Sequence, residues 1–233
     1  MSVIHQKLQE LHARIGAAAQ NAGRDPRQIT LLAVSKTFGA DAVIEAARAG
    51  QTAFGENYLQ EALDKIAAVR VAAPEFLLEW HFIGPIQSNK TRPIAENFDW
   101  VHSVEREKIA QRLSEQRPAH LPPLNVCLQI NISGEASKSG ATLEEAPALA
   151  LAIASMPRLT LRGLMAIPEP AEGFEQQRAP FRQLRELFER LKAQGLALDT
   201  LSIGMSSDLD AAIAEGATIV RVGTAIFGQR HYP

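Results

Sequence analysis

The chain has 233 residues, of which 46% are hydrophobic and 21% charged, and its formal net charge at pH 7 is −2. This is an ordinary globular composition with enough apolar material for a core, and the charge gives no reason to expect nucleic acid or an anionic membrane as a partner. The sequence lacks both the apolar block of a signal peptide and the ~20 apolar residues that span a bilayer, so we expect a soluble, cytoplasmic protein.

Strand-like and helix-like segments alternate along the chain after an amphipathic N-terminal helix. Ile4, Leu8, Leu11 and Ile15 recur at helical spacing at the start. From residue 29 onward there are eight strand-like runs, with a helical pattern between each consecutive pair. The predicted strands cover residues 29–36, 51–57, 78–85, 99–104, 124–133, 159–168, 199–206 and 218–228.

This alternation predicts an α/β protein with a parallel sheet covered by helices, and eight units is the number that closes a barrel. We therefore predict a (β/α)8 TIM-type barrel with an extra N-terminal helix. An open, doubly wound sheet is the alternative. The proline-containing stretch 117–125 is the best candidate for a domain boundary, but it is equally typical of a loop between a helix and a strand. We expect one domain, residues 1–233.

Lys36 follows the first predicted strand, and the functional site of such a barrel lies at the carboxyl ends of its strands. Strand alternation places Leu32, Val34 and Lys36 on one face. If that face points inward, desolvation lowers the pKa of the Lys36 amine and makes it nucleophilic toward a carbonyl. The alternative is a lysine that extends from a strand end into solvent. The strand alone does not decide between the two.

The last two units favour phosphate binding, which in barrels commonly uses the loops after strands seven and eight. The segment "SIGMSSDLDAAIAEG" offers a glycine, two hydroxyls and a helix start, and Ser207 to Asp210 fits the S-x-x-D pattern of a capping box. The segment "RVGT" supplies another glycine and hydroxyl. A nucleophilic lysine and a phosphate cradle on one rim suggest pyridoxal 5′-phosphate, whose aldehyde and phosphate need these groups.

Arg221 shares a strand face with Ile219 and Gly223, and it therefore points the same way as the glycine of the predicted cradle. An arginine beside the pyridine nitrogen of the cofactor would keep that nitrogen unprotonated, and a neutral ring is a poorer electron sink than a pyridinium. The alternative is an arginine in a salt bridge inside the barrel.

Six motifs carry a family resemblance: "LLAVSKT", "FGENYLQEALDK", "EWHFIGPIQSNK", "QINIS", "RGLMAIP" and "LSIGMSSDLDAAIAEGATIVRVGTAIFG". In order, and over nearly the whole chain, they resemble the pyridoxal phosphate homeostasis protein family, which is related to the N-terminal barrel of alanine racemase. The resemblance implies a fold-type III barrel with Lys36 as the Schiff-base lysine and Arg221 beside the pyridine nitrogen. It places five more residues at the cofactor: Ser206, Gly223 and Thr224 around the phosphate, and Asn57 and Met165 lining the pocket.

The resemblance also implies a function, that of carrying or buffering the cofactor and maintaining vitamin B6 and amino-acid homeostasis. Similar racemases use two bases, one of them a tyrosine from a C-terminal β domain. This chain ends at "GTAIFGQRHYP" and has only Tyr58 and Tyr232, which disfavours two-base racemisation. We therefore do not expect this chain to be a dedicated enzyme. The alternatives are a fold-type III racemase or decarboxylase of narrow scope, and a cofactor-free Schiff-base aldolase.

The remaining expectations concern partners and individual residues. Without the second domain of the racemases we expect a monomer, with cofactor-requiring apoenzymes as candidate recipients. Cys127, the only cysteine, is interpreted as a small buried hydrophobe, and the six histidines show no metal-ligand spacing, so no metal is predicted. His81 is interpreted as a core histidine, with ligand contact as the alternative. Lys138 is either a solvated loop lysine or, like Tyr58, a participant in cofactor transfer.

Overall fold

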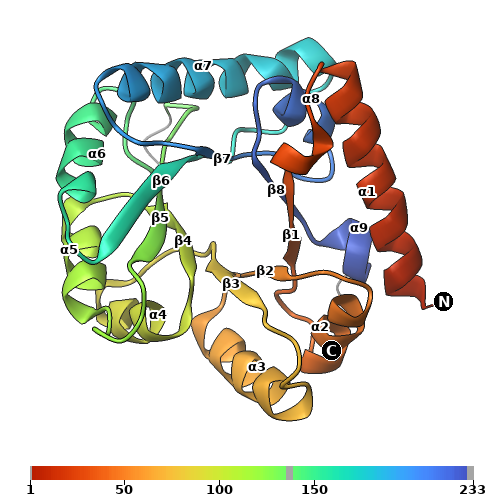
Figure 1. Cartoon of the computed structure of the whole chain (residues 1–233). Coiled ribbons are helices and arrows are strands. Elements are labelled where there is room, and N and C mark those ends of the chain that lie inside the picture. The colour runs from red at the N-terminus through yellow and green to blue at the C-terminus, as the bar shows by residue number, and fades with distance from the viewer. Residues whose placement is uncertain (1, 135–138, 230–233) are drawn as a thin grey trace.

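Eight parallel strands close into a barrel in the computed structural model, which describes residues 2–134 and 139–229. The strands follow one another in chain order, and β8 (Ile219–Val222) pairs with β1 (Thr30–Val34) to close the ring. Helices surround the strands on the outside (Figure 1). The predicted closed barrel is confirmed and the open sheet is excluded. Lys138 and Tyr232 lie outside the described residues.

Each strand is followed by a helix on the outer layer. The other strands are β2 (Ala53–Glu56), β3 (Glu79–Phe82), β4 (Trp100–Val104), β5 (Leu124–Gln129), β6 (Leu159–Met165) and β7 (Thr200–Ser202). The helices are α1 (Val3–Asn21), α2 (Ala40–Arg48), α3 (Leu59–Ala72), α4 (Thr91–Asn97), α5 (Glu107–Gln116), α6 (Ala146–Ala154), α7 (Phe174–Ala193), α8 (Leu209–Ala214) and α9 (Thr224–Phe227). Short 3-10 turns cover Pro26–Gln28 and Ser88–Lys90.

The last two strands are shorter than predicted. Residue 204 is a glycine with φ +94°, a left-handed conformation that ends β7 shortly after Ser202. The run 218–228 is wrong as a single strand, because the chain leaves the extended conformation at Gly223 (φ −117°, ψ −66°) and continues as the helix α9. The apolar residues that suggested a longer strand include Ile226, which is buried on that helix.

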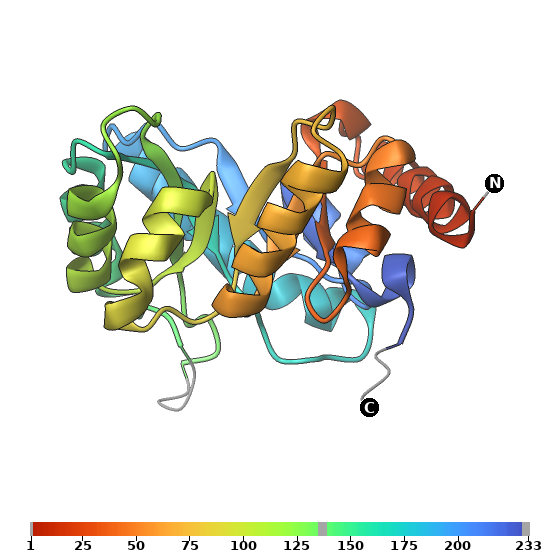
Figure 2. The same cartoon turned by 90° about the horizontal axis from the view of Figure 1, so that it is seen from below.

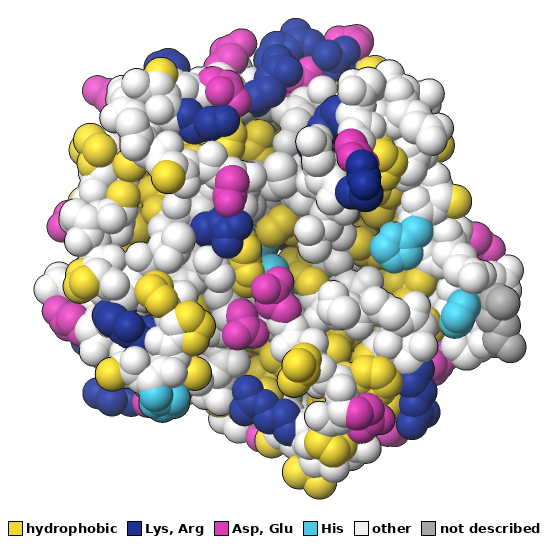
Figure 3. All heavy atoms as spheres, in the orientation of Figure 1, with side chains coloured by type: hydrophobic (Ala, Val, Ile, Leu, Met, Phe, Trp, Pro, Cys, Tyr) yellow, Lys and Arg dark blue, Asp and Glu magenta, His cyan; other side chains and the backbone are white. Residues whose placement is uncertain are grey.

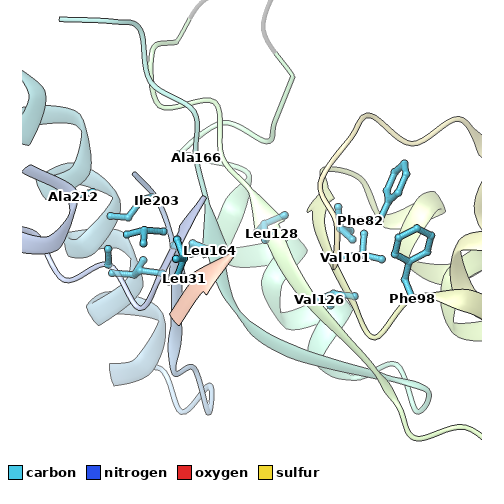
Figure 4. Packing of buried hydrophobic residues seen from close by; sticks show 14 of the residues in the cluster. Leu31, Phe82, Phe98, Val101, Val126, Leu128, Leu164, Ala166, Ile203 and Ala212 are labelled. Atoms are coloured by element: carbon cyan, nitrogen blue, oxygen red, sulfur yellow. The ribbon is translucent and has the colours of Figure 1, made fainter. Parts of the chain in front are cut away.

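Strand alternation divides the apolar core into two parts. Outward-facing strand residues such as Val101, Val126 and Leu128 pack in one large cluster with Phe82 and Phe98 (Figure 4). A smaller cluster collects the inward-facing side chains of six strands: Leu32, Ala53, Trp100, Cys127, Met165 and Ile219. The interior of the barrel is therefore filled by side chains, as in other barrels of this size.

The two ends of the barrel differ in what they carry. The strands run downward in Figure 2, so the carboxyl ends and their loops lie at the bottom of that view, and Figure 1 looks onto the end where the strands begin. The N-terminal helix α1 packs against α8 and α9 beside this ring. Within the described residues, none of the helices is both long enough and apolar enough to cross a bilayer.

Candidate functional site

Lys36 lies in the turn directly after β1 and is half-buried. The next residue, Thr37, has φ +70° and is the one non-glycine residue with a positive φ in the described chain. A β-branched residue in this region costs of order 1–3 kcal/mol, so the surrounding structure must hold it there. The amide of Thr37 donates to Oε1 of Glu61 at 2.6 Å, and this bond fixes the turn just after the lysine.

A buried ion pair holds the turn from the other side. Nζ of Lys65 donates to the carbonyl oxygen of Ser35 at 2.7 Å, to Oε1 of Glu56 at 2.6 Å and to Oε1 of Glu61 at 3.0 Å. The hydroxyl of Ser35 also donates to Glu56, at 2.6 Å. Burial raises the pKa of Glu56, and the neighbouring Lys65 opposes that rise. We call Ser35, Glu56, Glu61 and Lys65 the Lys65 cluster.

The Lys65 cluster was missed at the sequence level. Its local signals are the i,i+4 spacing of Glu61 and Lys65 on one helix, and the position of Glu56 on the outward face of β2. Neither signal says that both charges are buried against the residue before Lys36. That contact depends on how α3 packs on the strands.

Asn57 follows β2 on the same rim, and its amide oxygen Oδ1 is buried without a hydrogen-bond partner in the described part of the chain. It lines two adjacent hollows of about 460 Å³ and 480 Å³, which also share Pro85, Ile86 and Glu105. Tyr58 lines the second hollow and is half-exposed. An orphaned buried acceptor beside a hollow is a place where a ligand could supply the missing donor.

Arg221 is buried inside the barrel, and its nearest partners are neutral. Nη1 donates to the carbonyl oxygen of Ser202 and, at 2.7 Å, to the Ser202 hydroxyl, while Nη2 donates to the carbonyl oxygen of Ala166 at 2.9 Å. No carboxylate of the described residues lies within 4 Å of it, so the salt-bridged alternative is not observed. Burial lowers the pKa of Arg221 to about 10, which leaves the guanidinium charged at neutral pH.

The loop after β7 differs in detail from the predicted capping box. The N-cap of α8 is Asp208, which caps no helix amide. Its carboxylate instead accepts from the amide of Met205 at 2.6 Å, and this bond closes the 205–208 turn. The predicted Ser207-to-Asp210 capping box is therefore wrong, whereas the helix start that it marked is confirmed, because α8 begins at Leu209. Ser206 is half-buried in this turn, and its carbonyl oxygen accepts from Nη1 of Arg14 at 3.0 Å.

Gly223 and Thr224 bring the end of β8 against the turn that carries Lys36. A Cβ at Gly223 would lie 2.9 Å from the carbonyl oxygen of Val34, the last residue of β1. The ring of Phe38 packs on that of Phe227 in α9 at 5.2 Å between centroids. Thr224 begins α9, whose first amides have no intrahelical acceptor and no side-chain cap. Within the described chain no side chain caps these donors, and they lie beside the lysine turn.

Three further residues have the following positions. Met165, the last residue of β6, is buried in the inner cluster with Leu32 and Cys127. Burial raises the pKa of the Cys127 thiol to about 12, which agrees with its interpretation as a buried hydrophobe. His81 is also buried, between Glu79 and His102, as expected of a core histidine. Among the described residues, no group of histidine, cysteine, aspartate or glutamate side chains has the arrangement of a metal site.

The model of the alanine racemase N-terminal domain family matches residues 7–231 of the chain. The pyridoxal phosphate homeostasis protein of Pseudomonas aeruginosa is 64% identical over 232 residues, which cover 100% of this chain and 98% of the relative. The structure of PipY from Synechococcus elongatus PCC7942 with PLP bound is 36% identical, with a TM-score of 0.83 and coverage of 97% of this chain and 100% of PipY.

The likeness to alanine racemase itself is one of fold. The enzyme from Corynebacterium glutamicum is 20% identical with a TM-score of 0.65, and the match covers 97% of this chain but 61% of the racemase.

Proposed function

Because this chain belongs to the pyridoxal phosphate homeostasis protein family, within the alanine racemase N-terminal domain family, we propose that it binds pyridoxal 5′-phosphate and carries or buffers it. In this role it maintains the intracellular balance of vitamin B6 and amino acids. One observation carries the proposal: the amine-bearing turn after β1 and the uncapped start of α9 after β8 touch on one rim, through Gly223 against Val34 and Phe38 against Phe227.

The residues of this rim offer the chemical groups that the cofactor needs. Lys36 would supply the amine that holds the aldehyde of the cofactor covalently. Hydroxyls and main-chain amides at Ser206, Gly223 and Thr224 would hold the phosphate. The orphaned Oδ1 of Asn57 supports a ligand on this side of the rim, and Met165 closes the barrel beneath it.

Arg221 would face the pyridine nitrogen. Of its five N–H donors, three bond described residues, so the Nε–H and one Nη2–H remain available for a ligand. When bound, the cofactor supplies an electron sink for carbanions at an attached amino acid, and the strength of that sink depends on protonation of the ring. A guanidinium beside the ring nitrogen would keep that nitrogen unprotonated and so weaken the sink, which suits a carrier better than a catalyst.

We also propose that the chain is not a dedicated enzyme. The relative that it matches over 98% of its length is named for cofactor homeostasis rather than for a reaction. Tyr58 is the one tyrosine in the described residues, and it is half-exposed at the start of α3. Racemisation by two bases needs a second proton-transferring group fixed opposite the lysine, and an exposed side chain is poorly suited to that task.

Two measurements test the proposal. The protein is loaded with pyridoxal 5′-phosphate, reduced with borohydride and mapped by peptide mass, with Lys36→Ala as the variant and exposed Lys108→Ala as the control. We expect a pyridoxyl adduct on Lys36 that Lys36→Ala abolishes, whereas an adduct mainly elsewhere would refute the site. The loaded protein is then incubated with amino acids in D2O. Rapid α-proton exchange with inversion for one of them would overturn the carrier function in favour of a racemase.

A further inference from the structure

A chain of four polar side chains, three of them buried, crosses the barrel interior. Oε1 of Glu79 lies 2.8 Å from Nε2 of His81, whose Nδ1 lies 2.8 Å from Nε2 of His102. Nδ1 of His102 lies 2.7 Å from the hydroxyl of Ser202, which Arg221 contacts at 2.7 Å. We call Glu79, His81, His102 and Ser202 the interior chain.

The interior chain joins opposite walls of the barrel and both of its ends. Glu79 and His81 belong to β3 and His102 to β4, whereas Ser202 is on β7 and Arg221 on β8, half-way round the ring. The Glu79 side chain is 49% exposed at the end where the strands begin, and the other three members are buried. Figure 3 looks onto that end, where charged side chains surround the centre and part of a histidine shows beneath them.

Donor and acceptor rules give the interior chain one direction. An ionised carboxylate only accepts, so Nε2 of His81 donates to Glu79. A neutral His81 then accepts on Nδ1 from Nε2–H of His102, and a neutral His102 accepts on Nδ1 from the Ser202 hydroxyl. Arginine only donates, so the Ser202 oxygen accepts from Arg221 while its own proton goes to His102. Each neutral imidazole is thus fixed as the Nε2–H tautomer, between a cation at one end and an anion at the other.

The interior chain connects Arg221 to the anion of Glu79, although the arginine has no carboxylate in contact. We propose that the chain positions Arg221: by aligning four hydrogen bonds between the guanidinium and Glu79, it fixes the orientation and the potential that Arg221 presents at the carboxyl rim. This proposal rests on the proposed function, in which that guanidinium faces the cofactor ring. Hydrogen bonds in series polarise one another, so an interruption at any link reaches the arginine.

The electrostatic surroundings agree with neutral imidazoles. Burial lowers the pKa of His81 and lowers that of His102 well below its ordinary value, and the nearby charge of Arg221 lowers the latter further. The hydrogen bond from His81 lowers the pKa of Glu79, which keeps the carboxylate charged. Other charged groups act on these residues from neighbouring positions: Asp99 on His81, Arg162 on Glu79, and Asp208 on Arg221.

Ser202→Ala is the central test, because it removes the hydroxyl that bridges Arg221 and His102 but keeps the Ser202 carbonyl. Ser202→Thr retains a hydroxyl and serves as the rescue. Thr200→Val is the matched control, since Thr200 is buried on the same face of the same strand and its hydroxyl bonds only Asp199, at 2.7 Å. Glu79→Gln, at the half-exposed end, provides a second interruption that keeps an acceptor oxygen but removes the charge.

The first readout is independent of any cofactor. In nitrogen-15 NMR spectra at pH 7, we expect both imidazoles as Nε2–H tautomers with slowly exchanging protons, and we expect Ser202→Ala to perturb the His102 signals. A protonated imidazole or an Nδ1–H tautomer at either histidine would overturn the direction of the chain.

The second readout is the absorbance spectrum of the bound cofactor, its dependence on pH, and the cofactor affinity. We expect Ser202→Ala to shift the spectrum and to weaken binding roughly threefold to tenfold, the effect of losing one hydrogen bond. Ser202→Thr restores both, Thr200→Val changes neither, and Glu79→Gln shifts the spectrum less. Wild type could bind the cofactor through Lys36 while Ser202→Ala and Glu79→Gln have the same cofactor spectrum and affinity as Thr200→Val. That result would refute the positioning role and leave the proposed function standing. A wild-type protein that binds no cofactor would refute the proposed function, and with it the cofactor-facing part of this proposal.

Discussion

Nζ of Lys65 lies 2.6 Å from Oε1 of Glu56, and both side chains are shielded from solvent directly behind the turn that carries Lys36. The same ammonium donates to the carbonyl oxygen of Ser35, so one buried cation holds a strand end, a carboxylate and the residue before the lysine. The second oxygen of Glu56 has no hydrogen-bond partner in the described residues, which makes its charge depend on Lys65.

We therefore expect Lys65→Met to lower the free energy of unfolding by about 3–5 kcal/mol, because it leaves Glu56 charged or forces it to take up a proton inside the protein. Denaturant unfolding at pH 7 measures the change. Adding Glu56→Gln should recover part of the loss, since it removes the unpaired charge. Lys108→Met, on the exposed face of α5, is the control and should change stability by less than about 0.5 kcal/mol. A loss for Lys65→Met no larger than for this control would show that the buried pair does not hold the turn.

The contact between Gly223 and Val34 gives a second prediction. Because a Cβ at position 223 would lie 2.9 Å from a backbone oxygen, Gly223→Ala must push the ends of β1 and β8 apart. We expect a loss of about 1–3 kcal/mol in unfolding free energy and weaker binding of pyridoxal 5′-phosphate.

Gly16→Ala is the matched control, since a Cβ there meets nothing within 4 Å and the position is helical. It should stabilise the protein by up to about 1 kcal/mol and leave cofactor binding unchanged. Equal cofactor affinity in both variants would contradict a cradle at Gly223.

The barrel could be predicted because the same pattern, a strand-like run followed by a helical segment, recurs along the chain. Eight apolar runs separated by helical patterns specify a closed parallel sheet even though the predicted ends of single strands were off by several residues. Strand alternation grouped Leu32 with Lys36 and Ile219 with Arg221, and the structure shows that Leu32 and Ile219 both belong to the inner cluster. The error at 218–228 arose because the sequence "TAIF" suits a strand or a short helix, and only the backbone angles at Gly223 decide between them.

The contacts of the candidate site were harder to predict, because they join residues far apart in the sequence. His102 and Ser202 are 100 positions apart, and nothing local to either strand says that they meet inside the barrel. The salt bridge that was the alternative for Arg221 is absent among the described residues, and the guanidinium is bonded instead to two carbonyls and a hydroxyl. The capping-box prediction near Asp208 was wrong for a different reason. An aspartate can cap a helix or close its own turn with equal ease, and here Asp208 closes its turn.

The buried histidines give a prediction about pH. Burial lowers the pKa of His81 and of His102 in the folded protein below the ordinary 6.5, so the unfolded chain binds more protons than the folded one under mildly acidic conditions. Stability therefore falls as the pH drops below about 6.5, by at most about 1.4 kcal/mol for each histidine between pH 7.5 and 5.5, which is the limit for an imidazole that stays neutral in the folded protein. Unfolding free energies at these two pH values measure the change.

A variant isolates this effect from that of His12, whose pKa burial also lowers. His102→Asn should be less stable than wild type at pH 7.5 but should lose less on acidification. If the variant and wild type lose the same free energy between the two pH values, His102 is not held neutral by the fold.

Asn57 and Asn97 differ in their hydrogen bonds, so substitutions at the two positions can distinguish an effect on cofactor binding from an effect on stability. Oδ1 of Asn57 is buried without a partner in the described chain, whereas Nδ2 of Asn97 donates to the carbonyl oxygen of Pro93 at 2.9 Å. Asn57→Ala removes a polar atom that gains nothing in the ligand-free protein, so its unfolding free energy should change by less than about 1 kcal/mol. Its affinity for pyridoxal 5′-phosphate should fall by roughly threefold to tenfold, because the ligand loses the acceptor. Asn97→Ala should do the opposite, costing about 1 kcal/mol in stability with the affinity unchanged.

Cofactor titration and denaturant unfolding of both variants make the comparison. If Asn57→Ala destabilises the ligand-free protein and leaves the affinity intact, the orphaned oxygen serves the fold, and the ligand does not reach this side of the rim.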